Sequence, residues 1–387
     1  MSETILGCCA FLLLAPFVLY PLGVMVWAFL LPPRVRPTHS SRLPTLAICI
    51  AARDEGDALP QKLRNTLDLD YPPDRRVIRV LSDGSTDETD DVARAHAEEG
   101  VQLFRTGARL GKTETAIRGT ADLDVDVLVF TDATSEVSSR ALRALVDAVG
   151  QPGVGCATGR VTWSGGEGAI GRGFRMYAEV DTAIRRAEAR VGTAVVVSGA
   201  LHAVRRTVFA SAPPDLSYDL VLPFLTSVQG LRTDYVDEAV VLEAARERVA
   251  TEWRARVRLG VRSFRFARWA LSRGAGCPRL TWWVQFMGHK LLRWLGGVWV
   301  LGAGVTAALF AGESFPALAT GQLLIVWAGL VFLAVLPGGR RLPGVGLALF
   351  VWTVLSAYVV ALGKTATGAR VEGWSPEREE VTRREMT

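Results

Sequence analysis

The stretch Arg76-Val77-Ile78-Arg79-Val80-Leu81-Ser82-Asp83-Gly84-Ser85-Thr86-Asp87-Glu88-Thr89 decides the fold of this 387-residue chain. Its first half is short, apolar and β-branched, which is typical of a strand buried on both faces. Gly84 allows a sharp turn, and the hydroxyl side chains after it can cap a helix over residues 87–99. This order places Asp83 at the carboxyl end of a parallel sheet, where open α/β sheets bind ligands. A βα turn of any α/β protein looks the same, so the turn alone leaves the function open.

The alternation of strand and helix continues on both sides of this stretch. Further strands are predicted at Thr45–Ala51, Val101–Phe104 and Val125–Phe130, with helices between them. This βαβαβαβ order predicts a parallel, right-handed, doubly wound sheet. A second half follows, with strands predicted at Val154–Trp163, Val195–Ala200 and near Asp234 and Val240, and with helices predicted at 170–190 and from Ser217.

Apolar residues concentrate at the two ends of the chain. Ile5–Leu31 is long enough to cross a bilayer, which takes about 20 residues. Arginines follow it at 34, 36 and 42, so the positive-inside rule predicts an uncleaved anchor with its C-terminal side in the cytoplasm. Three more spans are predicted at Leu291–Ala311, Ala317–Leu336 and Val345–Leu362. Glu313 should then lie outside and Arg340 and Arg341 inside, but Lys364 and Arg370 do not fit this count, so the side of the tail stays open.

Charge and cysteine content narrow the class of protein. The formal net charge of +5 is modest, and the basic residues cluster near the apolar segments, which favours a membrane surface over nucleic acid. The five cysteines show no paired or zinc-type spacing. The sequence therefore predicts neither a disulfide framework nor a structural metal.

A helix predicted over Thr251–Leu271 has two distinct faces. One is apolar and includes Trp253, and the other carries Arg254, Arg258, Arg262, Arg265 and Arg268. The arginine face favours a helix that lies on anionic headgroups, with a solvated charged face as the alternative. Arg256 belongs to neither face and projects towards the edge of the apolar face. A charge without a partner is costly to bury, so an arginine turned towards the domain is expected to be more than a solubilising charge. Aromatic and basic residues over Trp282–Trp294 predict a second interfacial helix.

Acidic turns follow three strands of the predicted sheet, at Glu55, Asp83 and Asp132. In a parallel sheet they converge on one crevice. Asp83 can accept hydrogen bonds from a base or ribose, and Asp132 can hold Mg²⁺ or Mn²⁺, which takes its other ligands from substrate phosphates. Lys112 and Arg256 can neutralise a diphosphate. Together these side chains predict a nucleoside diphosphate site with a metal.

Asp219 lies in the second half of the chain and can take a proton from an incoming hydroxyl. The reaction class that uses all these groups is displacement at a carbon that bears a nucleoside diphosphate leaving group. Structural alternatives remain for single residues. Asp132 can cap a turn, Glu55 and Asp219 can cap helices, and Lys112 can be a solvated loop charge.

At these residues the sequence resembles the membrane-anchored glycosyltransferases of family two, which have the GT-A fold and include cellulose and hyaluronan synthases and ceramide glucosyltransferase. Leu81–Asp87 resembles their Asp-Asp-Gly-Ser-Thr-Asp turn, and Ala51–Glu55 their first nucleotide-binding turn. Gly111-Lys112 resembles the Gly-Lys of the next loop, and Thr131–Thr134 the metal-binding Asp-x-Asp. Tyr218-Asp219 occupies the place of an Asp-Asp or Glu-Asp pair, and Trp253–Val257 that of Gln-x-x-Arg-Trp.

The departures from the family pattern have consequences. Thr134 replaces the second carboxylate of the metal motif, which predicts weaker metal binding or more reliance on the diphosphate. Only the arginine of Gln-x-x-Arg-Trp remains, as Arg256, which puts processive polymerisation in doubt. The resemblance implies an inverting transfer in which Asp219 deprotonates the acceptor and Arg256, with Mg²⁺ or Mn²⁺, stabilises the leaving diphosphate.

The resemblance also implies a division of the chain into five parts. These are an N-terminal anchor and linker (1–42), a cytoplasmic GT-A domain (43–249), amphipathic or interfacial helices (250–294), C-terminal transmembrane helices (295–363) and a polar tail (364–387). The expected protein is a multi-pass enzyme of the cell membrane that moves a sugar from a nucleotide sugar, UDP-linked by resemblance, to a hydroxyl of a lipid or glycan. The alternative is a catalytically inactive membrane protein that binds nucleotide sugars.

Overall fold

The computed structural model describes residues 2–32, 43–245, 248–273, 279–310, 312, 314–334, 336, 339, 342 and 344–368. Its centre is one eight-stranded sheet with the order β3-β2-β1-β4-β7-β6-β8-β5. The strands are β1 (Leu46–Ala52), β2 (Arg76–Ser82), β3 (Val101–Arg105), β4 (Val127–Asp132), β5 (Glu136–Val137), β6 (Val154–Ser164), β7 (Leu201–Arg205) and β8 (Arg232–Ala244).

Four neighbouring strands, β3, β2, β1 and β4, are parallel, as the sequence predicted. Ile48 of β1 pairs with Ile78 of β2 and with Val129 of β4, and all three are buried. The apolar runs were good predictors here because these strands are covered on both faces. One core packs Ile48 and Ile50 against Leu63, and the other packs Ala47 and Cys49 with Phe130.

The other half of the sheet is mixed. β7 is antiparallel to β4 and β6, whereas β6 and β8 are parallel. The strand predicted at Val195–Ala200 is wrong, because the amide of Ser198 donates at 2.8 Å to the side-chain hydroxyl of Thr158 in β6 and not to the backbone of a strand. The strand begins only at Leu201. The two short strands predicted near Asp234 and Val240 are one continuous strand, β8.

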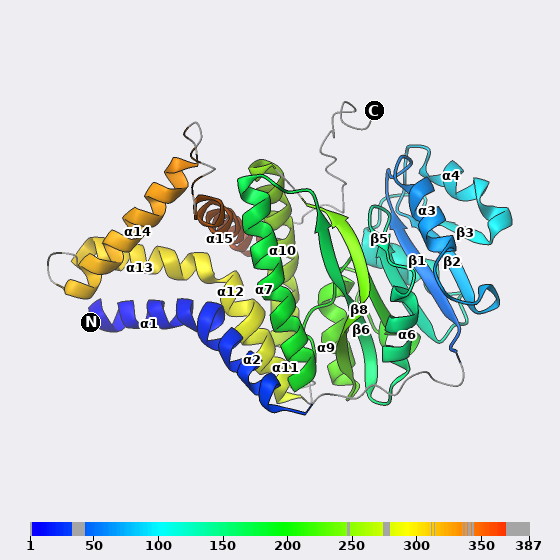
Figure 1. Ribbon diagram of the computed structural model, residues 1–387, viewed down its shortest axis with the longest axis horizontal. Helices are drawn as coiled ribbons and strands as arrows, with labels where there is room; N and C mark the ends of the chain where they lie inside the picture. The colour runs from blue at the N-terminus through cyan, green and yellow to red at the C-terminus, as the bar shows by residue number, and fades with distance from the viewer. Residues whose placement is uncertain are drawn as a thin grey trace.

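Helices connect the strands and cover the sheet. They are α3 (Leu59–Leu67), α4 (Thr89–Ala95), α5 (Lys112–Thr120), α6 (Ala141–Gly150), α7 (Ala169–Val191), α8 (Arg206–Phe209), α9 (Tyr218–Val228) and α10 (Val249–Ser272). The helix predicted over 87–99 is shorter, because the Asp87 carboxylate accepts the amide of Thr89 and a 3₁₀ turn follows at Ala97–Glu99. Figure 1 shows α7 and α10 between the sheet and the apolar helices.

Three helices are long and apolar enough to cross a membrane, or four if a bent pair is one span. The first is Glu3–Leu30, formed by α1 (Ser2–Leu14), the π-helix η1 (Ala15–Leu19) and α2 (Tyr20–Leu30), and the others are α14 (Phe315–Leu333) and α15 (Val345–Ala366). The bent pair joins α11 (Leu280–Phe286), the π-helix η5 (Met287–Leu291) and α12 (Leu292–Trp294) to α13 (Gly296–Phe310) at 56°.

Several topology predictions lie outside the described residues. They concern Arg34, Arg36, Arg42, Glu313, Arg340, Arg341, Arg370 and most of the tail at 364–387. The inside or outside location of these loops, and with it the cytoplasmic side of the catalytic domain, stays a prediction.

Candidate active site

The first two βα turns are held together by side chains of the stretch that decides the fold. The amides of Asp54, Glu55 and Gly56 donate to Ser85 Oγ, Thr89 Oγ1 and Asp87 Oδ2 at 3.2, 2.8 and 2.9 Å. Gly84 has φ +65°, and a Cβ there would lie only 3.0 Å from the backbone of Ala108 and Arg109. Glycine is therefore required for both its φ and its close approach to the next loop.

The Asp83 carboxylate forms hydrogen bonds with the protein's own backbone and side chains. The carboxylate is buried and accepts the amides of Leu110 and Gly111 at 2.7 and 2.9 Å and the hydroxyl of Thr115 at 2.9 Å. It does not line the cavity described below. Asp83 thereby anchors the start of α5 and positions Lys112, and its contact with a base or ribose stays a prediction.

Lys112 lies between the metal-binding candidate Asp132 and the start of α9, which comes from the second half of the chain. Its ammonium lies 2.5 Å from Asp132 Oδ1, and 5.3 Å from the ring centre of Tyr218. Burial alone would lower the pKa of Lys112, but Asp132, Tyr218 and Asp219 together raise it above its ordinary value. The alternative of a solvated loop charge is therefore wrong for Lys112.

A buried lysine that the sequence analysis did not single out, Lys62, holds the turn that carries Asp132. Lys62 of α3 is 2% exposed, and its ammonium donates to Thr131 Oγ1 and to the carbonyl of Ser135, both at 2.8 Å. These two residues flank the turn that carries Asp132. Burial lowers the pKa of Lys62 to about 7, although the charges of Asp132, Glu243 and Glu136 oppose the shift.

Replacing Lys62 is expected to change how stability depends on pH. Between about 7 and the ordinary value of 10.5 the unfolded chain carries a proton that the native Lys62 does not. Stability should therefore rise with pH across this window, with a slope of at most about 1.4 kcal/mol per pH unit from this group. Thermal melts of the wild type and Lys62→Met at pH 7.5 and 9.5 would test this. Equal pH slopes in the two proteins would contradict it.

Asp219 lies in the first turn of α9, across from Lys112. A Cβ on Gly199 would be 3.7 Å from Lys112 Nζ and 3.8 Å from Asp219 Oδ2, so the two groups flank the same glycine. The Asp219 carbonyl accepts the amide of Val197 at 3.2 Å, and Asp219 Oδ1 lies 3.1 Å from the amide of Leu220. The turn at 197–199 therefore holds Asp219 in place and borders the space beside its carboxylate.

His202 contacts the turn at 197–199 through Ser198. The sequence analysis had not identified this histidine. Its side chain is fully buried, and its Nδ1 lies 2.7 Å from the carbonyl of Ser198, so Nδ1 carries the proton. Burial lowers the pKa of His202 to about 4. It is therefore a neutral, positioning side chain.

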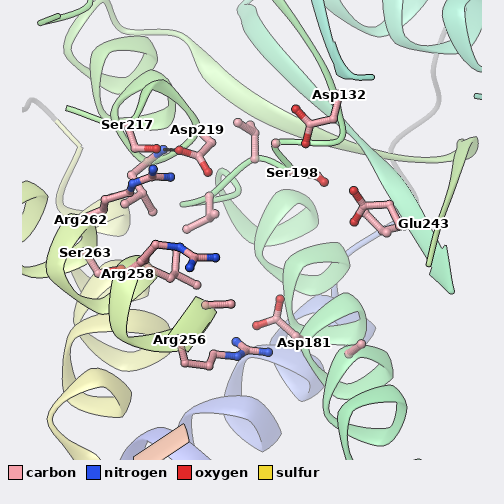
Figure 2. Close-up of a pocket in the computed structure, with 18 of the residues that line it drawn as sticks. Asp132, Asp181, Ser198, Ser217, Asp219, Glu243, Arg256, Arg258, Arg262 and Ser263 are labelled. Atoms are coloured by element: carbon pink, nitrogen blue, oxygen red, sulfur yellow. Dashed lines mark hydrogen bonds between the residues drawn. The ribbon is translucent and has the colours of Figure 1, made fainter. Parts of the chain in front are cut away.

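Lys112, Asp132 and Asp219 line one cavity of about 750 Å³. Figure 2 shows Asp132 and Asp219 near one end with Ser198 between them, and Arg256 and Asp181 at the other end. Glu55 is 2% exposed and also lines the cavity, while its carbonyl accepts the amides of Ala58 and Leu59 at the start of α3. The cavity thus unites five of the six predicted site residues, namely Glu55, Lys112, Asp132, Asp219 and Arg256.

The arginines of α10 are arranged differently from the prediction. Arg258 and Arg262, assigned to the headgroup face, line the cavity, and Figure 2 shows Arg262 beside Asp219. Burial lowers the pKa of Arg262, with Asp219 opposing the shift and Arg258 adding to it. Only Arg254 and Arg268 of the predicted stripe are exposed. Arg258 and Arg262 are four residues apart, so the sequence placed them on one face of the helix, but it could not tell what that face contacts.

Arg256 lines the cavity far from the predicted diphosphate. Its Nε lies 2.6 Å from the buried carboxylate of Glu252, and its guanidinium stacks within 5.7 Å of the rings of Phe174, Tyr177 and Phe350. Burial would lower its pKa, but Glu252 raises it. The guanidinium that Figure 2 shows near Asp219 is that of Arg262, and the role of Arg256 as a diphosphate clamp stays a prediction.

Comparison with known proteins agrees with this geometry. Residues 47–211 match the model of glycosyl transferase family 2. The chain is 29% identical over 113 residues to the probable glycosyltransferase YdaM of Bacillus subtilis (strain 168), and this match spans 28% of the chain and only 27% of that relative.

The fold as a whole matches a solved structure. The mannosyltransferase PcManGT from Pyrobaculum calidifontis, in complex with GDP-Man and Mn²⁺, superimposes with a TM-score of 0.72 and 21% identity, over 96% of this chain and 100% of that one. This likeness shows the fold and confirms the predicted α/β GT-A architecture. Residues 47–211 therefore match glycosyltransferase family 2, and the chain has the GT-A fold.

Proposed function

We propose that the protein transfers a sugar, with inversion, from a nucleoside diphosphate sugar to a hydroxyl of a membrane lipid or glycan. One observation carries this proposal: Asp132 with Lys112 and Asp219 with Arg262 face each other across one cavity. This supplies cations for a diphosphate on one side and a carboxylate base on the other. UDP remains the expected nucleotide from the sequence, and PcManGT was solved with GDP-Man.

The transfer is a single displacement. Asp219 takes the proton of the acceptor hydroxyl, whose oxygen attacks the anomeric carbon. The bond between that carbon and the diphosphate oxygen breaks, and the nucleoside diphosphate leaves with the electron pair. Lys112, Arg258 and Arg262 stabilise the negative charge that develops on the leaving group, because charge-assisted hydrogen bonds are strong in a partly dry cavity.

The donor set fits a divalent metal that is completed by substrate. Among the described residues no group of three or more His, Cys, Asp or Glu side chains is placed to hold a metal. Asp132 with diphosphate oxygens and water suits Mg²⁺ or Mn²⁺, which need only one or two protein carboxylates. Glu243, which lines the same cavity, is a second carboxylate that can compensate for Thr134. When bound, such an ion would act as a Lewis acid on the leaving diphosphate.

A membrane location follows from the apolar helices as part of the same proposal. The chain has three or four segments able to span a bilayer, at 3–30, 280–310, 315–333 and 345–366. The five expected parts, with the catalytic domain at 43–249 on the cytoplasmic side of the cell membrane, remain the proposed organisation.

A thermal-shift screen of the purified full-length protein tests the proposal. Nucleoside diphosphate sugars with Mn²⁺ should raise the melting temperature, because a ligand that binds only the folded state stabilises it by mass action. A radiolabelled-sugar assay on membranes would then show transfer. Binding without transfer to any acceptor would favour the catalytically inactive alternative.

Two substitutions on α10 separate the arginines. Arg262→Gln should lower kcat by about 10- to 10²-fold, since its guanidinium lies beside the base and the leaving group. Arg256→Gln should chiefly lower thermal stability, because it removes the guanidinium that pairs with the buried Glu252 carboxylate. Steady-state kinetics and melts of both variants would show this split. If Arg256→Gln removed turnover in a protein that melts normally while Arg262→Gln did not, the assignment would be reversed.

A further inference from the structure

A cluster of charged side chains closes the inner end of the cavity, next to the apolar helices. We call it the inner cluster, and it consists of Asp181, Arg185 and Glu188 of α7 with His289, Lys290 and Arg293 of η5 and α12. Apart from Arg185, each of these residues is more than nine-tenths buried. Asp181, Arg185 and Lys290 line the cavity.

The inner cluster contains more cations than anions. Asp181 lies 2.6 Å from Arg185 Nε, 2.8 Å from His289 Nε2 and 3.1 Å from Lys290 Nζ. Arg293 Nη1 is 3.8 Å from the same carboxylate and has no hydrogen-bond partner among the described residues. Two carboxylates, those of Asp181 and Glu188, thus face the cations of Arg185, Lys290 and Arg293.

His289 bridges the two carboxylates of the inner cluster. Its Nε2 faces Asp181 and its Nδ1 faces Glu188 Oε1 at 2.9 Å. A neutral imidazole has one donor and one acceptor, so two carboxylate partners suit an imidazolium that donates twice. Uncompensated positive charge away from water is costly. An anion at the inner end would remove this cost, and Lys290 has three N–H donors of which Asp181 accepts one.

The position of the inner cluster indicates where such an anion comes from. Tyr20 donates to Glu188 at 2.6 Å and Arg293 donates to the carbonyl of Pro16 at 3.0 Å, and both partners belong to the apolar helix Glu3–Leu30. Trp294 and Tyr358, from the bent pair and α15, line the cavity beside it. The inner end therefore lies where α7 meets the candidate membrane helices, so a lipid headgroup is the anion that we expect to reach it.

We propose that the inner cluster binds the phosphate of an anionic lipid, and that a hydroxyl of the same lipid is the acceptor that Asp219 deprotonates. This rests on the proposed function and names its acceptor class. Lys290 and Arg185 hold the phosphate through charge-assisted hydrogen bonds. The phosphate itself does not react; it sets the reach of the headgroup towards Asp219 at the other end of the cavity.

Lipid retention by the full-length protein in mild detergent tests this independently of turnover. Native mass spectrometry would follow a titration with phosphatidylglycerol, which has a phosphate and free hydroxyls, or with phosphatidylcholine, which has no net charge. The wild type should retain one phosphatidylglycerol in preference. Lys290→Gln should weaken this by about tenfold or more, since a charged hydrogen bond is lost, and Lys290→Arg should restore it. Arg268→Gln, an exposed arginine of α10, is the matched control.

Each further outcome supports or overturns the proposal. Equal retention of the two lipids, or retention unchanged in both Lys290→Gln and Arg185→Gln, would overturn it. Inorganic phosphate that stabilises the wild type as well as phosphatidylglycerol does would overturn the lipid part in favour of a soluble phosphorylated acceptor. If Lys290→Gln fails to fold, the charge-keeping Lys290→Arg and the milder Arg185→Gln still decide. Nucleotide binding in the same samples separates the two hypotheses: anionic lipid retained without nucleotide binding refutes the proposed function alone.

Discussion

Asp219→Asn is expected to lower turnover by about 10²- to 10⁴-fold, which is the usual contribution of a general base. The substitution keeps size and shape, and the asparagine oxygen can keep its place beside the amide of Leu220, now 3.1 Å from Asp219 Oδ1. It removes a negative charge beside Lys112 and Arg262. Binding of an anionic nucleotide should therefore stay the same or become tighter while transfer fails. Single-turnover kinetics with a radiolabelled donor, together with nucleotide titrations, would measure both.

The matched control for this experiment is Asp215→Asn. Asp215 is exposed and pairs with Arg265 at 3.3 Å outside the cavity, so its loss should leave transfer within a few-fold. Turnover that persists in Asp219→Asn at the level of Asp215→Asn would remove Asp219 from the role of base. The proton would then have to leave through another cavity carboxylate, such as Glu243.

The sequence predicted the nucleotide half of the fold because its strands carry strong local signals. β1, β2 and β4 are short apolar runs that end in acidic turns, and each was predicted to within two residues. The second half was harder, because buried apolar residues do not by themselves make a strand. Val195–Val197 is as apolar as β1, yet its backbone bonds to Asp219 and, through Ser198, to the Thr158 side chain.

The site was predicted as a set of residue types, and the direction of each side chain is the part that the sequence does not record. Asp83 was correctly placed at a strand end, but nothing in the sequence shows that the amides of Leu110 and Gly111 occupy its carboxylate. Helical spacing put Arg258 and Arg262 on one face of α10, but which face meets the cavity depends on how α10 packs against α15, seen in the contact of Phe264 with Tyr358. Tertiary packing decides such questions, and a single sequence does not record it.

Asp132→Asn is expected to abolish the effect of Mn²⁺ on nucleotide binding and to lower transfer by at least about 10²-fold, since a metal supplies several kcal/mol of charge stabilisation. Nucleoside diphosphate titrations with and without Mn²⁺ would measure the first effect apart from turnover. Asp124→Asn, fully exposed and 3.9 Å from Arg206, is the control. A variant that still binds nucleotide more tightly with Mn²⁺ would place the ion elsewhere, with Glu243 as the next carboxylate to test.

If Asp132 binds the metal, Lys112 should compete with Mn²⁺ for its carboxylate, and this competition can be measured. At 2.5 Å the ammonium occupies the carboxylate that a metal would need, so the two cations compete. Lys112→Met should therefore strengthen Mn²⁺ binding without nucleotide, by EPR titration, and weaken nucleotide binding without Mn²⁺, because Lys112 no longer meets the diphosphate. Losing both affinities together would instead mean that Lys112 only supports the shape of the site. Opposite changes would show that Lys112 pairs with Asp132 when no donor is bound and contacts the diphosphate when the donor is bound.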